Sequence, residues 1–493
     1  MFFTSTRKNC EISASAAIAK GISDEGGLFV PSEFPRFLPG ELESLVKLSY
    51  KERAARVLHK FLTDYTAEEL GVCVEGAYEG NFDNNEPAPV KEISPGENIL
   101  ELWHGPTCAF KDMALQILPY LLSAATRKNC PERTTVILVA TSGDTGKAAL
   151  DGFADVPGTR IIVFFPRDGV SDMQKLQMTT QKGENVAVCA IEGNFDDAQT
   201  GVKNIFADKE IVKFLEERNM EFSSANSINF GRLAPQIVYY ISSYCDLVKS
   251  GKIAMGSAIN VAVPTGNFGN ILAAYYAKQM GLPIKRFICA SNRNNILADF
   301  IGTGVYDRNR EFFTTESPSM DILISSNLER LLYHLSNGDC AQIAALMGEL
   351  KSTGRYTVSK EMLAKLQQEF YGGYCDDAAA RETIRECFEK QNYLCDTHTA
   401  VAVNVYRKYA AETGDTTPVV IASTASPYKF APAVLNAVGG NGEAKDGFAV
   451  MEELSALTGT PVPAPLAGLR EAEVLHKSSV AREAMSDFVR SVL

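Results

Sequence analysis

A chain of 493 residues is too long for one ordinary hydrophobic core, so we expect two or three domains. Its formal net charge of -12 argues against a general affinity for nucleic acid or for an anionic membrane, because both depend on basic surface. A hydrophobic share of 45% and a charged share of 22% are typical of globular proteins and exclude a fibrous or disordered chain.

The cysteines and the N-terminal sequence bear on the cellular compartment. The 11 cysteines occur singly from Cys10 to Cys395, and this spacing favours reduced thiols over a disulfide framework or a zinc site. The N-terminus lacks an apolar run long enough for a signal peptide, and no window of about 18 apolar residues occurs. We therefore expect a cytoplasmic protein with no bound metal.

The first part of the chain is predicted to be mostly helical. Residues 41–64 have helical apolar spacing, and Thr66 and Glu69 have the spacing of a helix-capping box. The Pro-rich stretch "NNEPAPVKEISPGEN" follows and indicates a boundary near residue 95. The prediction is an N-terminal domain of residues 1–95.

Beyond residue 95 the pattern changes to short β-branched runs separated by helix-length segments. Runs this apolar, bounded by Gly, Pro or Asp, indicate parallel strands that helices cover on both faces, an α/β architecture. The expected strands are residues 134–141, 159–166, 185–193, 258–265, 284–291 and 418–424. Between about 328 and 394 the strands are expected to stop, and the spacing predicts a helical insertion.

Three glycine-bearing or hydroxyl-bearing turns follow these strands, and the first is residues 141–146 in "ATSGDTGKAAL". Backbone N–H groups at such a helix entrance attract an anion. A P-loop is excluded, because Thr141 replaces its first glycine and Ala148 stands where Ser or Thr must contact magnesium.

The second and third turns also suit a ligand. In "PTGNFGN", Gly266 and Gly269 would let the backbone approach a phosphate closely. The spacing is not G-x-G-x-x-G, so a compact monophosphate fits better than a dinucleotide. In "STASPYKF", the hydroxyls of Ser423, Thr424 and Ser426 lie at the C-terminal end of a strand, where open α/β sheets bind ligands.

Lys111 gives the three turns a chemical interpretation. Each turn alone is more often a simple connection than a site. Lys111, however, follows a Gly-Pro turn at the entrance of a predicted helix, where the helix dipole disfavours a cation. A lysine that forms a Schiff base must lose its proton, which a desolvated or electropositive pocket favours. The combination predicts a reactive lysine beside anion-binding turns.

Four motifs resemble those of the threonine synthases, pyridoxal-phosphate enzymes of the tryptophan-synthase-β fold group: "HGPTCAFKD", "ATSGDTG", "PTGNFGN" and "STASPYKF". Longer segments such as "NSINFGRLAPQIVYY" look like the fungal and proteobacterial branch, and the resemblance covers nearly the whole chain. It implies a fold-type II pyridoxal-phosphate enzyme with two open, twisted, mainly parallel sheets flanked by helices. Residues 96–250 would form the first α/β lobe and residues 251–493 the second.

The resemblance also implies roles for individual residues. Lys111 is the expected Schiff-base lysine for pyridoxal 5'-phosphate, Asp144 is expected near the cofactor's phenolic oxygen, and Thr424 is expected to face its pyridine nitrogen. The loop expected to hold the cofactor phosphate is Gly266, Asn267, Phe268, Gly269 and Asn270.

The implied substrate is O-phospho-L-homoserine, which reacts with water to give L-threonine and phosphate. A substrate that carries its own phosphate needs a second anion site. The candidates are Ser142 and Thr145 for its carboxylate, and Asn229 and Arg232 for its phosphate. For Arg232 a salt bridge is an equally good interpretation.

Of the histidines, His104 is expected to have no proton-transfer role. His104 is expected close to the site, and the histidines at 59, 334, 398 and 476 lack metal-ligand spacing and are expected to be structural or surface residues. His398 is left open, because "CDTHTAVAV" resembles a family segment near the cofactor.

Two alternative functions stay open. A phospho-lyase of the same family would eliminate phosphate from the same substrate and release 2-oxobutyrate and ammonia, with the same lysine and loops. A non-catalytic binding protein on the same fold is the alternative of another class, and the presence of Lys111 argues against it. The expected oligomeric state is a monomer or a small homo-oligomer, with no nucleic-acid or membrane partner.

Overall fold

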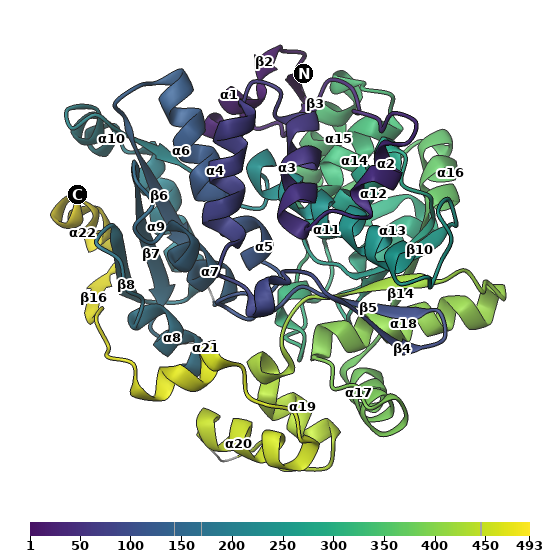
Figure 1. Cartoon of the computed structure of the whole chain (residues 1–493). Helices are drawn as coiled ribbons and strands as arrows, with labels where there is room; N and C mark the ends of the chain where they lie inside the picture. The colour runs from purple at the N-terminus through teal and green to yellow at the C-terminus, as the bar shows by residue number, and fades with distance from the viewer. Residues whose placement is uncertain (142, 169, 444–445) are drawn as a thin grey trace.

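Two open sheets organise the molecule (Figure 1), and the computed structural model describes residues 1–141, 143–168, 170–443 and 446–493. The five-stranded sheet has the order β16-β8-β7-β6-β9, and its paired strands are parallel. Its strands are β6 (Thr134–Ala140), β7 (Thr159–Pro166), β8 (Val186–Glu192), β9 (Met220–Ser223) and β16 (Ser478–Ala481).

The six-stranded sheet has the order β14-β11-β10-β15-β5-β4. Strand β4 is antiparallel to β5, and the other pairs are parallel. Its strands are β4 (Val90–Ser94), β5 (Glu97–Glu101), β10 (Ile259–Pro264), β11 (Ile284–Ser291), β14 (Phe370–Tyr374) and β15 (Val419–Ser423). The six strands expected from the sequence are all present, so the α/β architecture with two mainly parallel sheets is confirmed.

Helices cover both sheets, because apolar side chains point from both faces of a parallel sheet. The helices around the five-stranded sheet are α6 (Leu118–Asn129), α7 (Asp144–Phe153), α8 (Asp172–Thr179), α9 (Phe195–Ala207), α10 (Lys209–Glu216) and α22 (Met485–Val492). Those around the six-stranded sheet are α11 (Phe230–Lys249), α12 (Gly269–Met280), α13 (Ile296–Thr303), α17 (Asp377–Gln391), α18 (Thr397–Thr413) and α19 (Ala431–Ala437). Helix α20 (Gly447–Thr458) packs against α19, and α21 (Ala464–Ala467) follows it in the chain.

The N-terminal segment combines a small antiparallel sheet with four helices. The sheet has the order β2-β1-β3, and the elements are β1 (Phe2–Ser5), β2 (Ile12–Ser13), β3 (Phe29–Pro31), α1 (Ala14–Lys20), α2 (Glu41–Leu45), α3 (Tyr50–Phe61) and α4 (Ala67–Tyr78). The predicted capping box is confirmed at the start of α4. The Glu69 N–H donates to Thr66 Oγ1 at 3.1 Å, and the Thr66 N–H donates to the Glu69 carboxylate at 2.7 Å.

The structure adds detail at the predicted boundary near residue 95 and corrects the predicted helical insertion. The expected boundary near residue 95 lies in the turn of the β4-β5 hairpin, so the N-terminal segment runs into the six-stranded sheet. The range 328–394 contains strands as well as the helices α14 (Leu328–Leu335), α15 (Cys340–Thr353) and α16 (Lys360–Glu369). Strand β14 pairs with β11 at the sheet edge, and β13 (Arg355–Thr357) pairs with β12 (Val305–Asp307). The sequence of β14, "FYGGY", lacks the apolar β-branched run that marked the other strands.

The two sheets do not follow continuous chain ranges. Strand β5 precedes the five-stranded sheet in sequence yet lies inside the six-stranded one, beside β15. The C-terminal segment connects the two sheets in the opposite direction. After α20 it crosses the molecule, and β16 pairs with β8 in the five-stranded sheet (Figure 1). The two lobes are therefore tied together by both ends of the chain.

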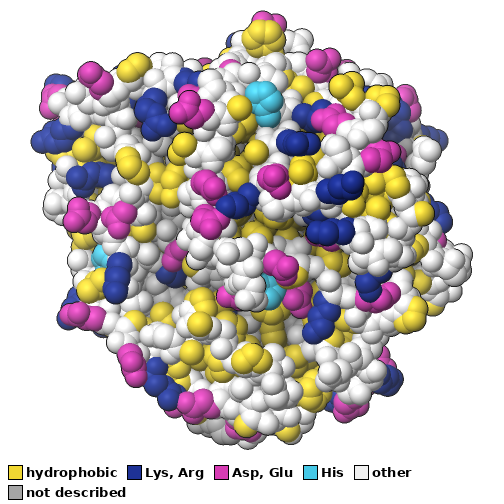
Figure 2. Space-filling view, in the orientation of Figure 1, with side chains coloured by type: hydrophobic (Ala, Val, Ile, Leu, Met, Phe, Trp, Pro, Cys, Tyr) yellow, Lys and Arg dark blue, Asp and Glu magenta, His cyan; other side chains and the backbone are white. Residues whose placement is uncertain are grey.

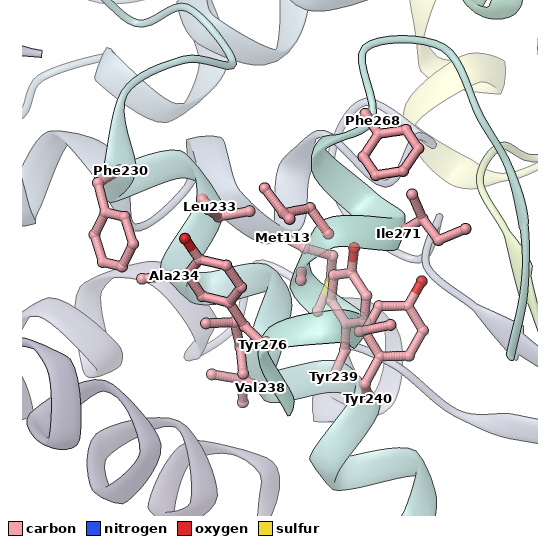
Figure 3. Packing of buried hydrophobic residues seen from close by; sticks show 14 of the residues in the cluster. Met113, Phe230, Leu233, Ala234, Val238, Tyr239, Tyr240, Phe268, Ile271 and Tyr276 are labelled. Carbon is pink, nitrogen blue, oxygen red and sulfur yellow. The ribbon is translucent and has the colours of Figure 1, made fainter. Parts of the chain in front are cut away.

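A buried cluster fixes the helices that carry the site. Figure 3 shows Met113 from α5 (Asp112–Leu115), Leu233 and Tyr239 from α11, and Ile271 and Tyr276 from α12, which belong to one cluster of fully buried side chains. Burying each such side chain stabilises the fold by about 1.5–3 kcal/mol. These three helices begin beside Lys111, Arg232 and the loop 266–270, so the core sets the relative positions of these groups.

Charged side chains of both signs are interspersed over the face shown in Figure 2. This mixture does not suit the phosphate backbone of a nucleic acid, which binds best to a continuous basic surface. Among the described residues, no helix is both long and apolar enough to cross a membrane.

Candidate active site

A cavity of about 690 Å³ is lined by segments that follow strands of both sheets. This volume lies in the usual range for small-molecule sites. The turns after β6, β10 and β15 all reach it. The predicted residues that line it are Lys111, Asp144, Thr145, Arg232, Gly266, Asn267, Phe268, Gly269, Asn270 and Thr424. Ser142 lies outside the described residues.

Lys111 stands at the start of the short helix α5, on the cavity wall. The preceding residue is fixed to the end of β15, since the Phe110 N–H donates to the Thr424 carbonyl at 2.8 Å. Burial lowers the pKa of the Lys111 amine, the charges of Lys429 and Arg232 lower it further, and Asp144 opposes them. The lysine therefore loses its proton more easily than a lysine in water.

The acid that follows Lys111 in the sequence does not pair with it. The Asp112 carboxylate accepts hydrogen bonds from the Thr107 N–H at 2.8 Å and from Thr107 Oγ1 at 2.6 Å. The side chain of Asp112 thus closes the "GPTCAFKD" turn. The Lys111 amine reaches the other side of the cavity instead, where Nζ lies 3.4 Å from Ser319 Oγ.

The loop 266–270 makes a tight turn into α12. A Cβ atom at Gly266 would lie 2.6 Å from the Ser319 carbonyl oxygen, so this position requires glycine. Phe268 has a φ of 62° at the N-cap of α12. Asn270 Oδ1 accepts from the Tyr239 and Tyr240 hydroxyls, and its buried Nδ2 has no hydrogen-bond partner among the described residues. An unpartnered amide donor at a helix N-terminus fits an anion.

Arg232 adds a second cationic group to the cavity. Its Nη1 donates to the Ala225 carbonyl at 2.9 Å, and its buried Nε has no partner in the part of the chain that the structure describes. Burial lowers the pKa of Arg232 to about 10, so the guanidinium stays charged at neutral pH. No carboxylate among the described residues pairs with it, so the salt-bridge interpretation is not supported.

Asp144, at the start of α7, faces a lysine that the sequence prediction missed. Lys429 Nζ lies 2.8 Å from Asp144 Oδ1, and Gln174 Nε2 donates to the same oxygen at 3.1 Å. Burial raises the pKa of Asp144, but the charges of Lys429 and Lys111 outweigh it and hold the pKa well below its ordinary value. The carboxylate therefore stays ionised.

Asn229 does not line the cavity, which corrects its prediction as a phosphate ligand. It is the fully buried N-cap of α11, and its Oδ1 accepts from the Gly231 N–H at 2.8 Å. Its Nδ2 donates to the carbonyls of Ile18 at 3.0 Å and Ser224 at 3.2 Å. Because the whole amide is engaged, Asn229 can only orient the helix that carries Arg232.

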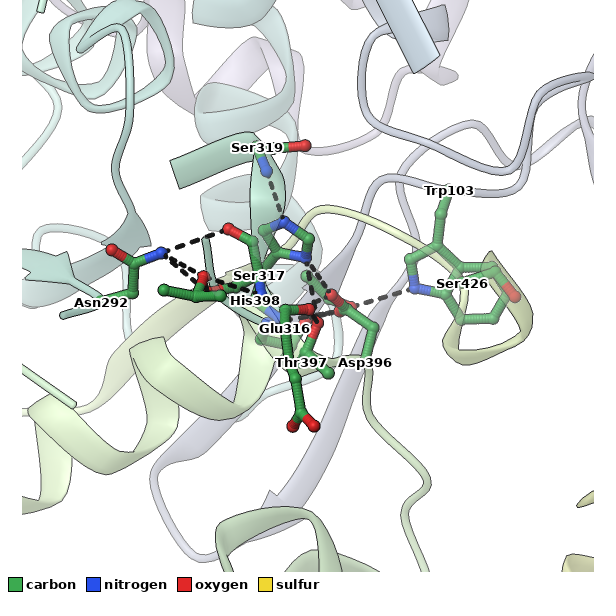
Figure 4. A network of polar contacts seen from close by, with 12 residues as sticks. Trp103, Asn292, Glu316, Ser317, Ser319, Asp396, Thr397, His398 and Ser426 are labelled. Atoms are coloured by element: carbon green, nitrogen blue, oxygen red, sulfur yellow. Dashed lines mark hydrogen bonds and ion pairs between the residues drawn. The ribbon is translucent and has the colours of Figure 1, made fainter. Parts of the chain in front are cut away.

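The structure places His104 and His398 differently with respect to the cavity. His104 is not among the cavity-lining residues, and its ring nitrogens face Glu101 at 2.9 Å and Asp83 at 3.3 Å. His398, which was left open, does line the cavity. It belongs to a buried polar network with Asp396 and Ser319 (Figure 4).

Comparisons with known proteins agree with this geometry. The family model described as "Pyridoxal-phosphate dependent enzyme" matches residues 99–425, the model "Threonine synthase N terminus" matches residues 2–78, and the model "Threonine synthase, C-terminal" matches residues 399–483. The threonine synthase of Pseudomonas aeruginosa is 39% identical over 415 residues, which cover 84% of this chain and 85% of that protein. The chain belongs to the threonine synthase family of pyridoxal-phosphate-dependent enzymes.

Two further relatives define its place in the threonine synthase family. The solved structure of PLP-bound threonine synthase from Brucella melitensis has a TM-score of 0.90 and 36% identity, covering 100% of this chain and 99% of that one. The protein named "Threonine synthase-like 1" from Homo sapiens is 45% identical over 455 residues, 88% of this chain and 60% of that protein. The chain thus spans about three fifths of the length of the curated relatives of that name.

The cavity residues of this threonine synthase family member fit its cofactor, pyridoxal 5'-phosphate. Lys111 supplies an amine of lowered pKa. The loop 266–270 supplies a glycine without room for a side chain and the unpartnered Asn270 amide. Thr424 supplies a hydroxyl at the end of β15. An amine, a phosphate cradle and a hydroxyl are the groups that this cofactor requires.

Lys429 was missed as a site residue and His398 was left open, for different reasons. Lys429 lies inside "STASPYKF", a motif that the sequence had already marked, so its charge was a usable signal. His398 lies in "CDTHTAVAV", where no spacing signal links it to Ser319, a residue 79 positions away.

Proposed function

We propose that this protein converts O-phospho-L-homoserine and water to L-threonine and inorganic phosphate. The observation that carries the proposal is that the cavity has two separate features for anions. One is the loop 266–270 with the Asn270 Nδ2, and the other is the guanidinium of Arg232 with its Nε; neither nitrogen has a hydrogen-bond partner among the described residues. A phosphorylated substrate can therefore bind beside a phosphorylated cofactor.

The roles of the chain's own residues follow from their positions. When bound, pyridoxal phosphate supplies an electron sink for negative charge at the substrate's α-carbon. The Lys111 amine, with its lowered pKa, is suited to take and return protons at the substrate's carbon atoms. Arg232 holds the substrate phosphate as the leaving group, and Thr145, at the start of α7, binds the carboxylate.

The atoms balance as follows. The Cγ–O bond breaks and phosphate leaves, and the hydrogen that Cβ loses is matched by one that Cγ gains. A hydroxyl from water adds to Cβ, and the second hydrogen of that water leaves with the phosphate. Lys111 lines the cavity and is the base that we assign to these proton transfers.

A phospho-lyase is the second candidate. The relatives named "Threonine synthase-like 1" are 44–45% identical to this chain, against 39% for the Pseudomonas aeruginosa threonine synthase. A lyase would use the same Lys111 and the same anion sites and would release 2-oxobutyrate and ammonia.

The proposal also includes a cytoplasmic location, because the eleven free cysteines suit a reducing compartment. The proposed oligomeric state is a monomer or a small homo-oligomer.

Product analysis separates the two functions. The purified protein is incubated with O-phospho-L-homoserine, and threonine, phosphate and 2-oxobutyrate are quantified. Threonine and phosphate in equal amounts would support the synthase, whereas 2-oxobutyrate and phosphate without threonine would identify the lyase. Lys111→Ala is expected to lose the visible absorbance of the bound cofactor and the activity together.

A further inference from the structure

A short backbone segment, residues 316–320, contacts both Lys111 and the phosphate loop, and we call it the strap. Ser319 Oγ lies 3.4 Å from Lys111 Nζ. The Ser319 carbonyl oxygen is the atom that lies 2.6 Å from the position of a Cβ at Gly266. Pro318, Ser319 and Met320 line the cavity. The position of the strap therefore affects both groups that hold the cofactor.

The first turn of α18 holds the strap at two points (Figure 4). The Ser319 N–H donates to His398 Nε2 at 3.1 Å, and Thr397 Oγ1 donates to the Glu316 carbonyl at 2.7 Å. From the opposite side, Asn292 Nδ2 donates to Ser317 Oγ at 3.0 Å. Helix α18 packs against β10, β11 and β15, so these tethers are anchored in the sheet.

Asp396 fixes which nitrogen of His398 carries hydrogen. Because Nε2 accepts the Ser319 N–H, the ring hydrogen is on Nδ1, which donates to Asp396 Oδ1 at 2.9 Å. Asp396 is the buried N-cap of α18 and also accepts from the His398 backbone N–H at 2.8 Å. The imidazole packs against Phe430, with ring centroids 4.7 Å apart. The ring is thus fixed in both position and tautomer.

We propose that His398 is a positioning residue for the cofactor site: it accepts the Ser319 N–H and so holds the strap against Lys111 and Gly266. This inference rests on the roles proposed for Lys111 and the loop 266–270. In this arrangement the lone pair of His398 Nε2 already accepts the Ser319 N–H, so it is not free to take a proton from the substrate. His398 therefore acts on the cofactor site through Ser319. Loss of the tether lets the strap move away from the lysine and the loop.

Two substitutions of the same residue test the proposal. In His398→Gln, the side-chain oxygen can still reach the place of Nε2 and accept the Ser319 N–H. In His398→Asn, the shorter amide can still donate to Asp396 but cannot reach Ser319. His59→Gln, at an exposed position, is the matched control. The dissociation constant for pyridoxal phosphate is measured from the fluorescence of Trp103, the single tryptophan, together with kcat and KM.

His398→Asn is expected to weaken cofactor binding about 10-fold, and His398→Gln is expected to recover most of this loss. Thr397→Val, which removes the second tether and keeps His398, is expected to weaken binding in the same direction. Equal losses in the Asn and Gln variants, or no loss in either, would overturn the proposal. Cofactor affinity is measured without substrate, so a failure to form threonine would overturn the proposed function and leave this test intact.

Discussion

Lys429 and Asp144 form a buried ion pair, with Nζ and Oδ1 2.8 Å apart and side chains only 2% and 7% exposed. The pair joins the segment after β15, a strand of the six-stranded sheet, to the start of α7, a helix beside the five-stranded sheet. Its two charges offset each other, so the charged guanidinium of Arg232, which lines the cavity, contributes a positive field inside. A cavity of positive field suits a phosphorylated cofactor and a phosphorylated substrate.

Lys429→Met is expected to lower the free energy of unfolding by about 3–5 kcal/mol, because it leaves a buried carboxylate unpaired. The double variant Lys429→Met with Asp144→Asn removes both charges and is expected to regain most of that stability. Urea unfolding of the two variants checks this. A double variant no more stable than the single one would show that the pair is not what stabilises this junction.

Arg232→Lys is expected to raise KM for O-phospho-L-homoserine about 10-fold or more while the cofactor absorbance is kept. A lysine keeps the charge but cannot bind the Ala225 carbonyl and a phosphate together as a guanidinium does. Arg218→Lys is the matched control, since Arg218 Nη1 also donates to a backbone carbonyl, that of Phe214 at 3.1 Å, outside the cavity lining. Steady-state kinetics that leave KM unchanged in Arg232→Lys would exclude Arg232 as the phosphate ligand.

The sequence predicted those parts of the fold that depend on local pattern. The six apolar runs became parallel strands because β-branched residues fit a sheet buried on both faces. It could not predict β14, because the glycines of this strand give no such signal. It could not predict β16 either, because this strand near the C-terminus is mostly exposed and pairs with the distant β8. Pairing between distant segments depends on tertiary packing, which a local pattern does not contain.

The site residues divide in the same way, into those that a local sequence pattern marks and those whose contacts depend on tertiary packing. The turns and Lys111 were recognisable because glycines, hydroxyls and a lysine follow strands at short spacing. Asn229 was assigned wrongly because a buried helix cap and a ligand both use an amide, and only its three hydrogen bonds distinguish them. His398 was left open, and its contact with Ser319 could not be predicted because Ser319 lies on a separate loop.

Asn229→Ala is expected to destabilise the fold without affecting substrate binding. Loss of the cap on α11 should lower the free energy of unfolding by about 1–2 kcal/mol. The KM for O-phospho-L-homoserine should stay within about 2-fold, because the amide is fully used by Ile18, Ser224 and Gly231. Thermal unfolding and kinetics are measured on the same preparation. A large rise in KM with unchanged stability would restore the original prediction of a substrate ligand.

His334→Gln is expected to make the fold less sensitive to acid. Burial, with a smaller contribution from Arg330, lowers the pKa of His334 from 6.5 to about 3. Between these values the unfolded chain binds a proton that the folded protein excludes, so stability is lost as the pH falls below 6.5. From pH 7 to pH 5 the loss is about 2 kcal/mol.

Glutamine removes this titration and can keep the hydrogen bond that joins Tyr276 Oη and His334 Nε2 at 2.9 Å. Urea unfolding at pH 7 and pH 5 should therefore show a smaller difference in His334→Gln than in the parent protein. The exposed His59→Gln serves as the control, and its difference should match that of the parent. If the parent and His334→Gln lose the same stability over this range, the buried imidazole is not the group that senses acid.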